Sequence, residues 1–520
     1  MQVIYLSEDR FQYDIHSLFK AFYPMDNVRM IVGKPGDNED KEKDISDNDE
    51  ISFIYFDIKE CEGGSCGTIT LKVSEDIMDS ADFFDKDKNA QGASHSTNGV
   101  TQELDNSKNA LKKLIYKVLS RKNGKELPWG NLTGIRPTRI AMNIVDNGGS
   151  DNEIRKYMKD MYFVSDEKID LSIRIARREK EILKDIDYEN GYSLYIGIPF
   201  CPTTCLYCSF TSYPIGAYKN IVGDYIKCLK KEIDYVADAF AGKTLDTIYV
   251  GGGTPTTLLP DQIDELLGYV HKKLDTSRVK EFTVESGRPD SITREKLQAM
   301  KSQGCDRISV NPQTMRDETL KLIGRQHNVA QLIDSFHMAR EEGFDNINMD
   351  IILGLPGETS EDVRYTMDEI KKLGPDDLTV HSLAIKRGSR LAEILKEKEI
   401  RGFSQKGDVA SFNNTEEMMK IAAFGAGDMG LTPYYLYRQK NISGNFENTG
   451  YAAPGKAGIY NILINEEVQS IVALGAGTVT KRVYGYDGRI ERCDNVKDVR
   501  LYMEQIDEMI NRKRELFNDK

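Results

Sequence analysis

The sequence predicts an α/β protein in which a run of parallel β/α units lies between a small α/β domain and a mostly helical C-terminal domain. Two observations predict the central part. From Ser193 to about Leu395, apolar strand-like runs alternate with helical patterns, which is typical of parallel strands joined by helical crossovers. Each glycine-rich or polar motif in this stretch directly follows such a run, where barrels of this class bind ligands.

The composition indicates a globular, cytoplasmic protein. Of the 520 residues, 39% are hydrophobic and 29% are charged, and the formal net charge is −13. This acidic balance argues against nucleic acid or an anionic membrane as the main partner. No apolar run approaches the ~20 residues that span a bilayer, and the first residues lack the pattern of a signal peptide. Eight cysteines in a chain of this length predict no disulfide scaffold, and we expect them to be reduced.

Residues 1–125 are predicted to form a small α/β domain of unassigned role. Gly36–Glu50 is an acidic stretch that we interpret as a solvated loop, and Asp82–Lys108, rich in Ser, Asn and Asp, is predicted to be mobile. Cys61 and Cys66 are interpreted as marking a turn, since one pair supplies too few ligands for a metal site. The patterns predict strands at Val3–Leu6, Arg29–Val32, Ile51–Ile58 and Thr68–Val73, and helices at His16–Phe22 and Asn109–Leu119.

A connector with helices is predicted at 126–190. Its first part, Leu127–Ile140, reads L-P-W-G-N-L-T-G-I-R-P-T-R-I and holds the only tryptophan of the chain. Proline and glycine predict ordered turns there. Arg136 and Arg139 have two interpretations: ion pairs within a packed linker, which we favour, or contacts with the carboxylates of a ligand.

The motif around which the prediction is built is Tyr195–Phe210, Y-I-G-I-P-F-C-P-T-T-C-L-Y-C-S-F. Cys201, Cys205 and Cys208 follow the strand-like run Leu194–Ile198 with the spacing C-x-x-x-C-x-x-C. A structural zinc site needs four ligands, and none of the six histidines of the chain lies near this loop. Three thiolates at this spacing predict a [4Fe–4S] cluster with one iron left open for a substrate or cofactor.

Further strand-like runs end in polar or glycine-rich motifs. Gly251–Thr256 reads G-G-G-T-P-T, and its N–H groups are expected to meet a carboxylate. Glu285 is a strand-end carboxylate suited to a ribose diol. Asp350, a lone charge in an apolar strand, is expected to be paired or to face a ligand. His381 is either a satisfied strand-end histidine or a catalytic one. The runs themselves are Thr247–Val250, Glu281–Val284, Arg307–Val310, Ile347–Leu353 and Leu378–Val380.

These motifs resemble the radical S-adenosylmethionine (SAM) superfamily. The flanks Y-I-G-I-P-F-C and C-S-F resemble the branch that contains oxygen-independent coproporphyrinogen III oxidase (dehydrogenase), and within it the HemZ-type subgroup. The resemblance covers about residues 190–490. It implies a partial (β/α)6 barrel at 191–405 and a coproporphyrinogen-oxidase-like domain at 406–520. It also implies a [4Fe–4S] cluster and one or two molecules of S-adenosyl-L-methionine as cofactors.

The resemblance implies roles for individual residues. Cys201, Cys205 and Cys208 would ligate the cluster, and Glu285 would bind the SAM ribose. Gln313 and Arg325 match positions that contact a second SAM molecule. The further positions implied to bind SAM are Tyr195, Tyr207, Gly252, Gly253, Thr254, Asp350 and Ala384.

The resemblance implies an oxidoreductase of heme and porphyrin biosynthesis that oxidatively decarboxylates coproporphyrinogen III propionates to vinyl groups. Its electron donor would be a reductase or a protein of the flavodoxin or ferredoxin type. The alternative within the branch is a heme-binding delivery protein without turnover. Coproporphyrinogen dehydrogenases have a cysteine and a histidine where this chain has Phe210 and Gly197. Heme chaperones have a His-Asn-x-x-Tyr-Trp-like segment where this chain has Ala457–Asn461.

Residues Tyr434–Lys440, Y-Y-L-Y-R-Q-K, combine aromatic rings with cations. Tyr434, Tyr437 and Arg438 would suit a flat macrocycle that carries propionates. The same residues would equally suit an aromatic core beneath a loop.

Overall fold

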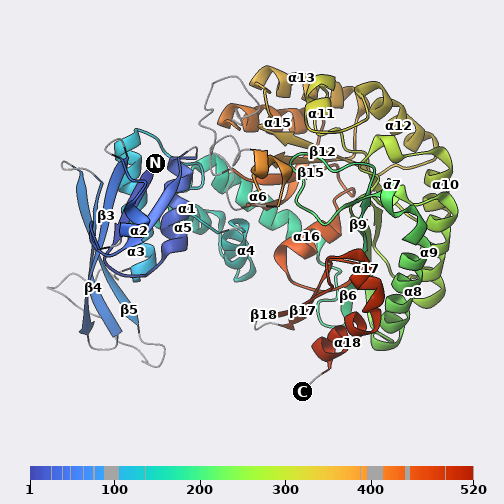
Figure 1. The fold of residues 1–520 in the computed structure, drawn as a ribbon, viewed down its shortest axis with the longest axis horizontal. Helices are drawn as coiled ribbons and strands as arrows, with labels where there is room; N and C mark the ends of the chain where they lie inside the picture. The colour runs from blue at the N-terminus through green and yellow to red at the C-terminus, as the bar shows by residue number, and fades with distance from the viewer. Residues whose placement is uncertain are drawn as a thin grey trace. The chain divides into compact units, whose positions relative to one another are not determined.

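The structure is a computed structural model that describes residues 1–24, 26–37, 39–46, 49–61, 64–73, 77–86, 105–134, 136–386, 388–394, 414–439, 446–485 and 488–518. It contains two compact units (Figure 1). Unit 1 comprises Met1–Ile173 and Arg438–Phe446, and unit 2 comprises Arg174–Tyr437 and Glu447–Lys520. The sequence-based boundaries at 125, 190 and 405 remain predictions, because these units are defined by compactness and not by independent folding.

Unit 1 contains a five-stranded sheet with the order β2-β1-β3-β4-β5. β1 is parallel to β2 and β3, whereas β4 is antiparallel to β3 and β5. The predicted strands are confirmed, and β5 is an additional one whose many acidic residues do not indicate a strand. The strands are β1 (Gln2–Leu6), β2 (Val28–Val32), β3 (Glu50–Cys61), β4 (Gly64–Lys72) and β5 (Met78–Lys86).

Helices α1 (Gln12–Phe22) and α3 (Ser107–Asn123) pack their apolar residues into the core of unit 1. α3 begins where the Asn106 side chain accepts a hydrogen bond from the Asn109 N–H, and it ends at Gly124, whose φ is +58°. The remaining helices that lie wholly within this unit are α2 (Glu39–Glu42), α4 (Thr138–Asp146) and α5 (Asp151–Tyr162).

Cys61 and Cys66 form a disulfide in the β3–β4 hairpin. In this hairpin Cys61 lies opposite Gly64, and Cys66 lies opposite Lys59. The interpretation of the pair as a turn marker is confirmed, but the expectation that every cysteine is reduced is wrong for these two. The strand register explains the difference, because it brings their Cα atoms to 5.9 Å, a normal separation for a disulfide.

The connector around Trp129 is packed. The Trp129 side chain has no exposed surface. The Ser165 N–H donates to the Pro128 carbonyl at 3.0 Å, and the Arg438 guanidinium donates to the Leu132 carbonyl at 2.7 Å. These contacts support the interpretation of this segment as an ordered linker.

Unit 2 is built on an 11-stranded sheet with the order β14-β15-β13-β12-β11-β10-β9-β6-β16-β17-β18. The six central strands are parallel and adjacent in chain order, as predicted. β13 pairs onward with β15, and β6 with β16, so the barrel is open between β13 and β6. The six strands are β6 (Gly191–Ile198), β9 (Thr244–Gly252), β10 (Glu281–Val284), β11 (Arg307–Ser309), β12 (Ile347–Leu353) and β13 (Asp377–Ser382).

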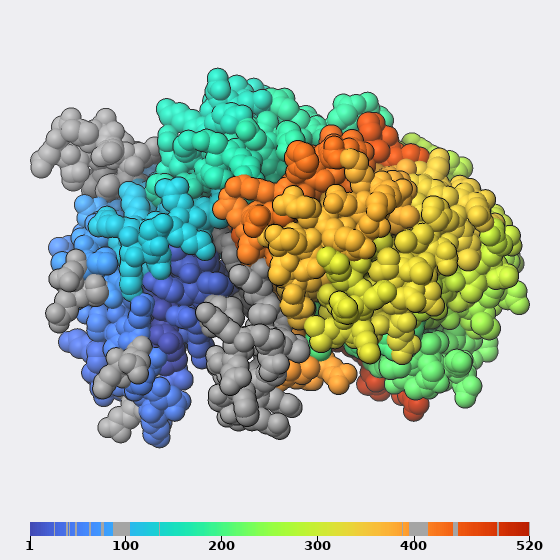
Figure 2. All heavy atoms as spheres, turned by 90° about the horizontal axis from the view of Figure 1, so that it is seen from above, coloured from blue at the N-terminus to red at the C-terminus, as the bar shows by residue number. Residues whose placement is uncertain are grey.

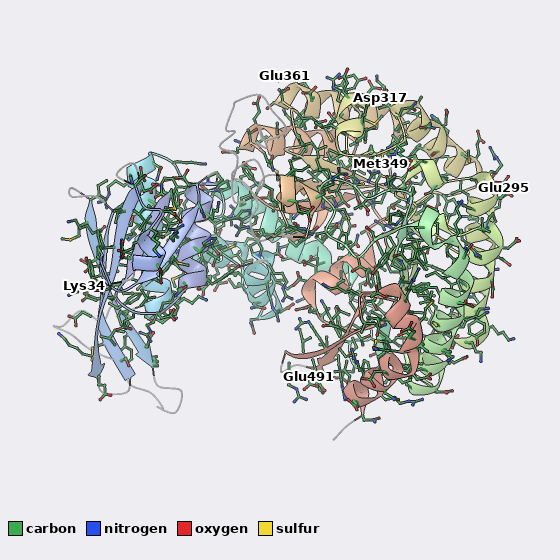
Figure 3. All side chains as sticks on the ribbon, viewed as in Figure 1. Lys34, Glu295, Asp317, Met349, Glu361 and Glu491 are labelled. Carbon is green, nitrogen blue, oxygen red and sulfur yellow. A yellow bond between two sulfur atoms is a disulfide. The ribbon has the colours of Figure 1, made fainter. Side chains whose placement is uncertain are left out.

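Crossover helices cover the outside of these strands (Figure 1). Met349 of β12 lies among the strands, whereas Glu295 and Glu361 lie on the outer helices (Figure 3). In the space-filling view, the yellow to gold segment that includes α12 and α13 lies at the surface of the molecule (Figure 2). No helix in the described part of the chain is long and apolar enough to cross a membrane. The helices are α6 (Asp166–Ile182), which spans the division between the units, and α7 (Ile215–Tyr218), α8 (Val222–Ala239), α9 (Pro260–Lys273), α10 (Arg294–Ser302), α11 (Asp317–Leu322), α12 (Val329–Glu341) and α13 (Ser360–Leu373).

The C-terminal part is helical, as predicted, and it also adds strands to both edges of the central sheet. β15 is antiparallel to β13, and β16 is parallel to β6. The helices are α15 (Glu416–Asp428), α16 (Ile459–Glu466), α17 (Val499–Glu504) and α18 (Ile506–Phe517). The strands are β14 (Thr432–Tyr437), β15 (Asn448–Ala452), β16 (Ser470–Leu474), β17 (Val479–Tyr484) and β18 (Arg489–Asp494).

Buried ionic groups occupy the amino ends of the parallel strands. Arg307, the first residue of β11, donates to the Asp377 carboxylate of β13 at 2.6 Å. The same carboxylate accepts a hydrogen bond from Tyr434 at 2.8 Å. Glu281, the first residue of β10, accepts from the Tyr460 N–H at the start of α16 at 3.1 Å. α16 is therefore anchored at the end of the barrel opposite to the strand ends that carry the predicted site.

A second buried network connects the C-terminal helix α18 to α8. The Lys513 ammonium lies 2.7 Å from the Glu232 carboxylate, and their side chains are 1% and 0% exposed. Glu232 also accepts hydrogen bonds from Tyr502, Asn495 and the Gly475 N–H. Removing one partner from such a buried ion pair leaves an uncompensated charge in the interior, which strongly destabilises the protein.

Candidate functional site

The cysteine loop begins directly after β6, at the carboxyl end of that strand. Cys201 lies in the short strand β7 (Phe200–Cys201), which pairs with β8 (Tyr213–Pro214). Cys201, Cys205 and Cys208 are all free thiols. The first two are buried and the third is half-buried. The loop therefore lies at the strand ends, where the sequence predicts the site.

Contacts from distant segments hold this loop in place. The Leu206 N–H donates to the Ile323 carbonyl at 2.9 Å, and the Leu391 N–H donates to the Leu206 carbonyl at 2.9 Å. The Thr203 hydroxyl donates to the Gly324 carbonyl at 3.2 Å. The loop is thus bonded to the segments that follow α11 and β13.

Two sulfur atoms accept hydrogen bonds. The Thr254 hydroxyl donates to Cys201 Sγ at 3.4 Å, and the Arg288 guanidinium donates to Cys205 Sγ at 3.6 Å. Arg288 is itself held by the Asp290 carboxylate at 2.9 and 3.0 Å. Hydrogen bonds to sulfur stabilise anionic thiolates and tune cluster potentials. Sequence reasoning missed Arg288, because it lies three residues beyond a strand-end motif that already had a carboxylate.

Two of the three cysteine thiols have raised pKa values. In the described ranges, no group of three or more His, Cys, Asp or Glu side chains is close enough to hold one metal ion. Burial raises the pKa of the Cys201 thiol to about 11, against the lowering effect of the Thr254 hydrogen bond. Burial also raises the pKa of Cys208. A coordinating metal deprotonates such thiols outright.

The glycine turn after β9 packs against the cysteine loop. The Gly253 N–H donates to the Ile198 carbonyl at 2.8 Å, and the Thr254 N–H donates to the Phe200 carbonyl at 2.7 Å. A Cβ at Gly253 would lie 2.7 Å from the Phe200 carbonyl oxygen, so only glycine fits there. The expectation that these N–H groups await a ligand carboxylate is wrong for Gly253 and Thr254, since both already donate within the protein.

Glu285 follows β10 and faces the glycine turn. Its carboxylate accepts a hydrogen bond from the Tyr249 hydroxyl at 2.6 Å. A Cβ at Gly251 would lie 2.9 Å from the Glu285 carboxyl carbon. Burial raises the pKa of Glu285 to about 7, with the Asp350 charge adding to the effect and the Tyr249 hydrogen bond opposing it. A carboxyl group tuned in this way at a strand end is typical of a functional site.

Asp350 of β12 is paired, as the sequence argument requires of a charge within an apolar strand. Its two carboxylate oxygens accept hydrogen bonds from Asn311 and Asn348, each at 2.8 Å. His381 Nε2 lies 3.8 Å from the carboxylate, and its Nδ1 lies 3.4 Å from the Tyr437 hydroxyl. Burial acts to raise the pKa of Asp350, but His381 and Asn348 outweigh it and lower that pKa.

Gln313 and Arg325 lie beside Asp350 and the cysteine loop, respectively. Gln313 has a φ of +66° and bridges to β12 through its N–H, which donates to the Asp350 carbonyl at 2.9 Å. A left-handed backbone conformation costs about 1–3 kcal/mol in a non-glycine residue, and residues with this conformation are concentrated at functional sites. Arg325 donates to the Asn311 carbonyl at 2.8 Å and contacts the Tyr207 hydroxyl at 3.4 Å.

A stack of three tyrosines lies within the barrel. The rings of Tyr195 and Tyr249 are 6.1 Å apart, and both stack on Tyr460, at 6.0 and 4.4 Å. Tyr460 comes from α16, which sequence reasoning did not place in the barrel. Ala384 is buried in the segment after β13. The predicted SAM contacts thus lie on β6, β9 and β12, in the segments after β9, β10, β11, α11 and β13, and in the cysteine loop.

The predicted macrocycle surface is not supported at two of its residues. The Tyr434 side chain is fully buried and donates to Asp377, and Arg438 is 7% exposed and donates to the Leu132 carbonyl. Both are committed to the protein interior, which agrees with the alternative of an aromatic core. Tyr437 is half-buried near His381. Lys440 lies outside the described residues.

Comparisons with known proteins agree with this geometry. The Radical SAM superfamily matches residues 195–370. The oxygen-independent coproporphyrinogen-III oxidase-like protein HemZ of Bacillus subtilis is 40% identical over 410 residues, covering 78% of this chain and 80% of that protein. The heme chaperone HemW of the same organism is 37% identical over 194 residues, which are 37% of this chain and 50% of HemW. The structure of coproporphyrinogen III oxidase (HemN) from Escherichia coli has a TM-score of 0.48 and 22% identity, covering 64% of this chain and 73% of that one.

A parallel barrel with this cysteine loop at its strand ends defines a radical SAM protein. Its cofactors are those of the superfamily, a [4Fe–4S] cluster and SAM. The chain belongs to the family of HemZ, within the branch that also contains HemN and HemW.

Replacing Glu285 by glutamine is expected to weaken SAM binding by roughly 1–3 kcal/mol, the range for leaving buried polar partners unpaired. A carboxyl group with a pKa of about 7 is protonated below that pH and accepts hydrogen bonds best above it. The affinity of the unaltered protein for SAM should therefore rise as the pH rises through 7, whereas that of Glu285→Gln should stay flat. Anaerobic titration of SAM into the reconstituted protein measures both. Unchanged affinity in both Glu285→Ala and Asp350→Ala would show that the pocket lies elsewhere.

Proposed function

We propose that this protein is an oxygen-independent coproporphyrinogen dehydrogenase-like enzyme, which converts propionate side chains of coproporphyrinogen III to vinyl groups. Cys201, Cys205 and Cys208 ligate the cluster, and Glu285 and Asp350 line the SAM site. The observation that carries the proposal is the cysteine loop itself. Its three thiols are free, two receive hydrogen bonds, and the loop is fixed beside Glu285 and Asp350 at one end of the barrel.

Cys201, Cys205 and Cys208 would hold the cluster, which together with SAM would supply hydrogen-abstracting radical chemistry at the β-carbon of a propionate. The chain's own residues bind and orient the cofactors and the substrate, and they shield them from water. Arg288 and Thr254 stabilise negative charge on the cysteine sulfurs through their hydrogen bonds. Ionised Glu285 accepts hydrogen bonds from hydroxyl groups of the ribose. The Asn311 and Asn348 amides hold Asp350 in one orientation toward the site.

Two partners and a cellular location follow from this proposal. The substrate is a tetrapyrrole, whose propionate would lose a hydrogen atom to the adenosyl group, then CO₂, and one further electron to a separate one-electron acceptor. The electron that reduces the cluster comes from a reductase or a donor of the flavodoxin or ferredoxin type. Such chemistry, which requires reduced cysteine ligands, belongs in the cytoplasm.

A heme-delivery function is the second candidate, and the similarity to HemW favours it. A heme carrier needs an axial ligand such as His, Cys, Met or Tyr for the iron. In the segment that matches the histidine-bearing segment of heme chaperones, this chain has Ala457–Asn461, without a histidine. A porphyrinogen holds no iron and needs no such ligand, so the segment favours the enzyme.

Turnover of coproporphyrinogen III distinguishes the decarboxylating enzyme from the heme-delivery protein. We expect the reconstituted protein, incubated anaerobically with SAM, a reductant and coproporphyrinogen III, to form 5′-deoxyadenosine and vinyl-bearing products that have lost CO₂. Mass spectrometry of the porphyrin fraction measures this. Stoichiometric heme binding with a ligand-type Soret band, without deoxyadenosine formation from coproporphyrinogen, would instead establish a delivery protein.

A further inference from the structure

Among the residues that the structure describes, Arg288, Arg325 and Lys386 lie against the cysteine loop, and Lys386 has no oxygen partner there. Arg288 and Arg325 direct their guanidinium groups to carboxylate and carbonyl oxygens of the protein. Lys386 interacts electrostatically with Cys208. Its ammonium makes no hydrogen bond or ion pair with another residue in the part of the chain that the structure describes. A half-buried ammonium without a counter-ion is costly unless an anion reaches it.

The Lys386 ammonium lies instead against an aromatic ring. Its Nζ is 5.0 Å from the centroid of Phe210, within the range of a cation–π contact. Phe210 follows the third cysteine by two positions, and 68% of its surface is exposed. An exposed phenyl ring and an unpaired cation thus lie together at the rim of the cysteine loop.

The position of Lys386 is fixed by its neighbours and not by its own bonds. Ile385, the preceding residue, packs against the same buried cluster as Leu206 and Tyr207 of the cysteine loop. The Leu391 N–H donates to the Leu206 carbonyl at 2.9 Å. The segment after β13 is therefore docked on the cysteine loop, and Lys386 is presented toward Cys208 and Phe210. Nothing local in the sequence marks this lysine, because its neighbours in space are about 180 residues away in the chain.

The geometry points to Lys386 and Phe210 as the substrate-recognition pair of this site, in which the ammonium binds a carboxylate of the substrate and the ring contacts its flat apolar body. This inference rests on the proposed function and names the residues that select the substrate. An ammonium forms a charge-assisted hydrogen bond with a carboxylate. An aromatic ring offers a rigid face to a planar ligand. In a protein with a net charge of −13, a local cation at the site offsets the general repulsion of a polycarboxylate.

The competing role for Lys386 is compensation of the negative charge on the cluster and its thiolates. The two roles predict different effects of replacing the lysine. Substrate recognition makes the affinity for a carboxylate-bearing tetrapyrrole depend on it. Charge compensation makes the reduction potential of the cluster depend on it, because removal of a nearby positive charge disfavours the more negative reduced state.

Binding of coproporphyrin III to the reconstituted holoprotein with SAM tests the inference. We expect Lys386→Met to raise the Kd for coproporphyrin III by about tenfold or more, the loss that corresponds to one charged hydrogen bond. Lys386→Arg should recover most of the affinity, and Phe210→Ala should weaken the binding of both coproporphyrin III and its uncharged tetramethyl ester. Affinity for the ester should be the same in Lys386→Met and in the unaltered protein. Difference absorbance in the Soret region follows each titration.

Lys371→Met is the matched control, since Lys371 lies on the outer helix α13 and pairs with Asp428. It should leave every value unchanged. Equal coproporphyrin affinity in Lys386→Met and in the unaltered protein would overturn the inference, above all if the cluster potential shifts instead. Failure of the proposed function has a different signature: coproporphyrin binds in a Lys386-dependent manner, but coproporphyrinogen is not decarboxylated. Absence of any coproporphyrin binding by the unaltered protein would refute both.

Discussion

Alanine at Cys205 is expected to abolish the brown charge-transfer absorption of the reconstituted protein and all cleavage of SAM. The same result is expected for Cys201 and Cys208. An iron–sulfur cube with one open iron has only three protein ligands, so the loss of any one exposes a second iron and removes the cluster. Iron and sulfide analysis measures the cluster content, visible spectroscopy measures the charge-transfer absorption, and detection of 5′-deoxyadenosine measures SAM cleavage.

The remaining cysteines provide the controls. Cys493→Ala should retain full iron content and full SAM cleavage, because Cys493 lies on β18, outside the cysteine loop. Cys228 is a second control on α8. Removal of the Cys61–Cys66 disulfide in unit 1 should also leave the cluster intact. Full iron loading in Cys205→Ala would contradict the assignment of the ligands.

The second large effect is expected at Lys513. Replacing it by methionine leaves the Glu232 carboxylate buried without its cation, and breaking a buried pair in this way costs about 3–5 kcal/mol. The free energy of unfolding, measured by urea denaturation, should fall by that amount. In the variant, α18 should also detach from α8 at a lower urea concentration than in the unaltered protein, because the Lys513–Glu232 pair joins the two helices.

A double variant separates the lost ion pair from the lost lysine stem. Glu232→Gln combined with Lys513→Met removes both charges, so it should be more stable than Lys513→Met alone. Lys227→Met is the control, since Lys227 is exposed and pairs with Asp224 on the same helix. A loss in Lys513→Met no greater than in Lys227→Met would show that the buried network adds nothing to stability.

Much of the site could be predicted because its residues follow strands. The carboxyl ends of parallel strands meet at one end of a barrel, so a residue's place after a strand predicts its place in the site. Glu285 after β10 and Asp350 within β12 were accessible to this argument, and their hydrogen bonds and pKa shifts agree with it. The cysteine spacing was equally accessible, because three ligands within eight residues form one local loop.

Groups that act across the fold could not be predicted in this way. Arg288 reaches Cys205 only because the segment after β10 lies over the cysteine loop. Tyr460 enters the barrel because α16 is anchored to Glu281 by a contact between residues 179 positions apart. The glycine turn has its amides bonded internally, which no sequence pattern reveals.

The sequence by itself determined the class of chemistry and the order of the β/α units, and it supplied the candidate ligands of the cluster, since each depends on local spacing and on strand periodicity. Only the tertiary structure decided which side chains serve the site and which serve the core. Tyr434 and Arg438 have the chemistry of substrate contacts, yet both are buried against protein oxygens. Lys386 has no distinguishing pattern, yet it lies at the rim of the cysteine loop. The physical reason is that burial and pairing are settled by long-range packing, which closes loops of a hundred residues or more and leaves no local trace in the chain.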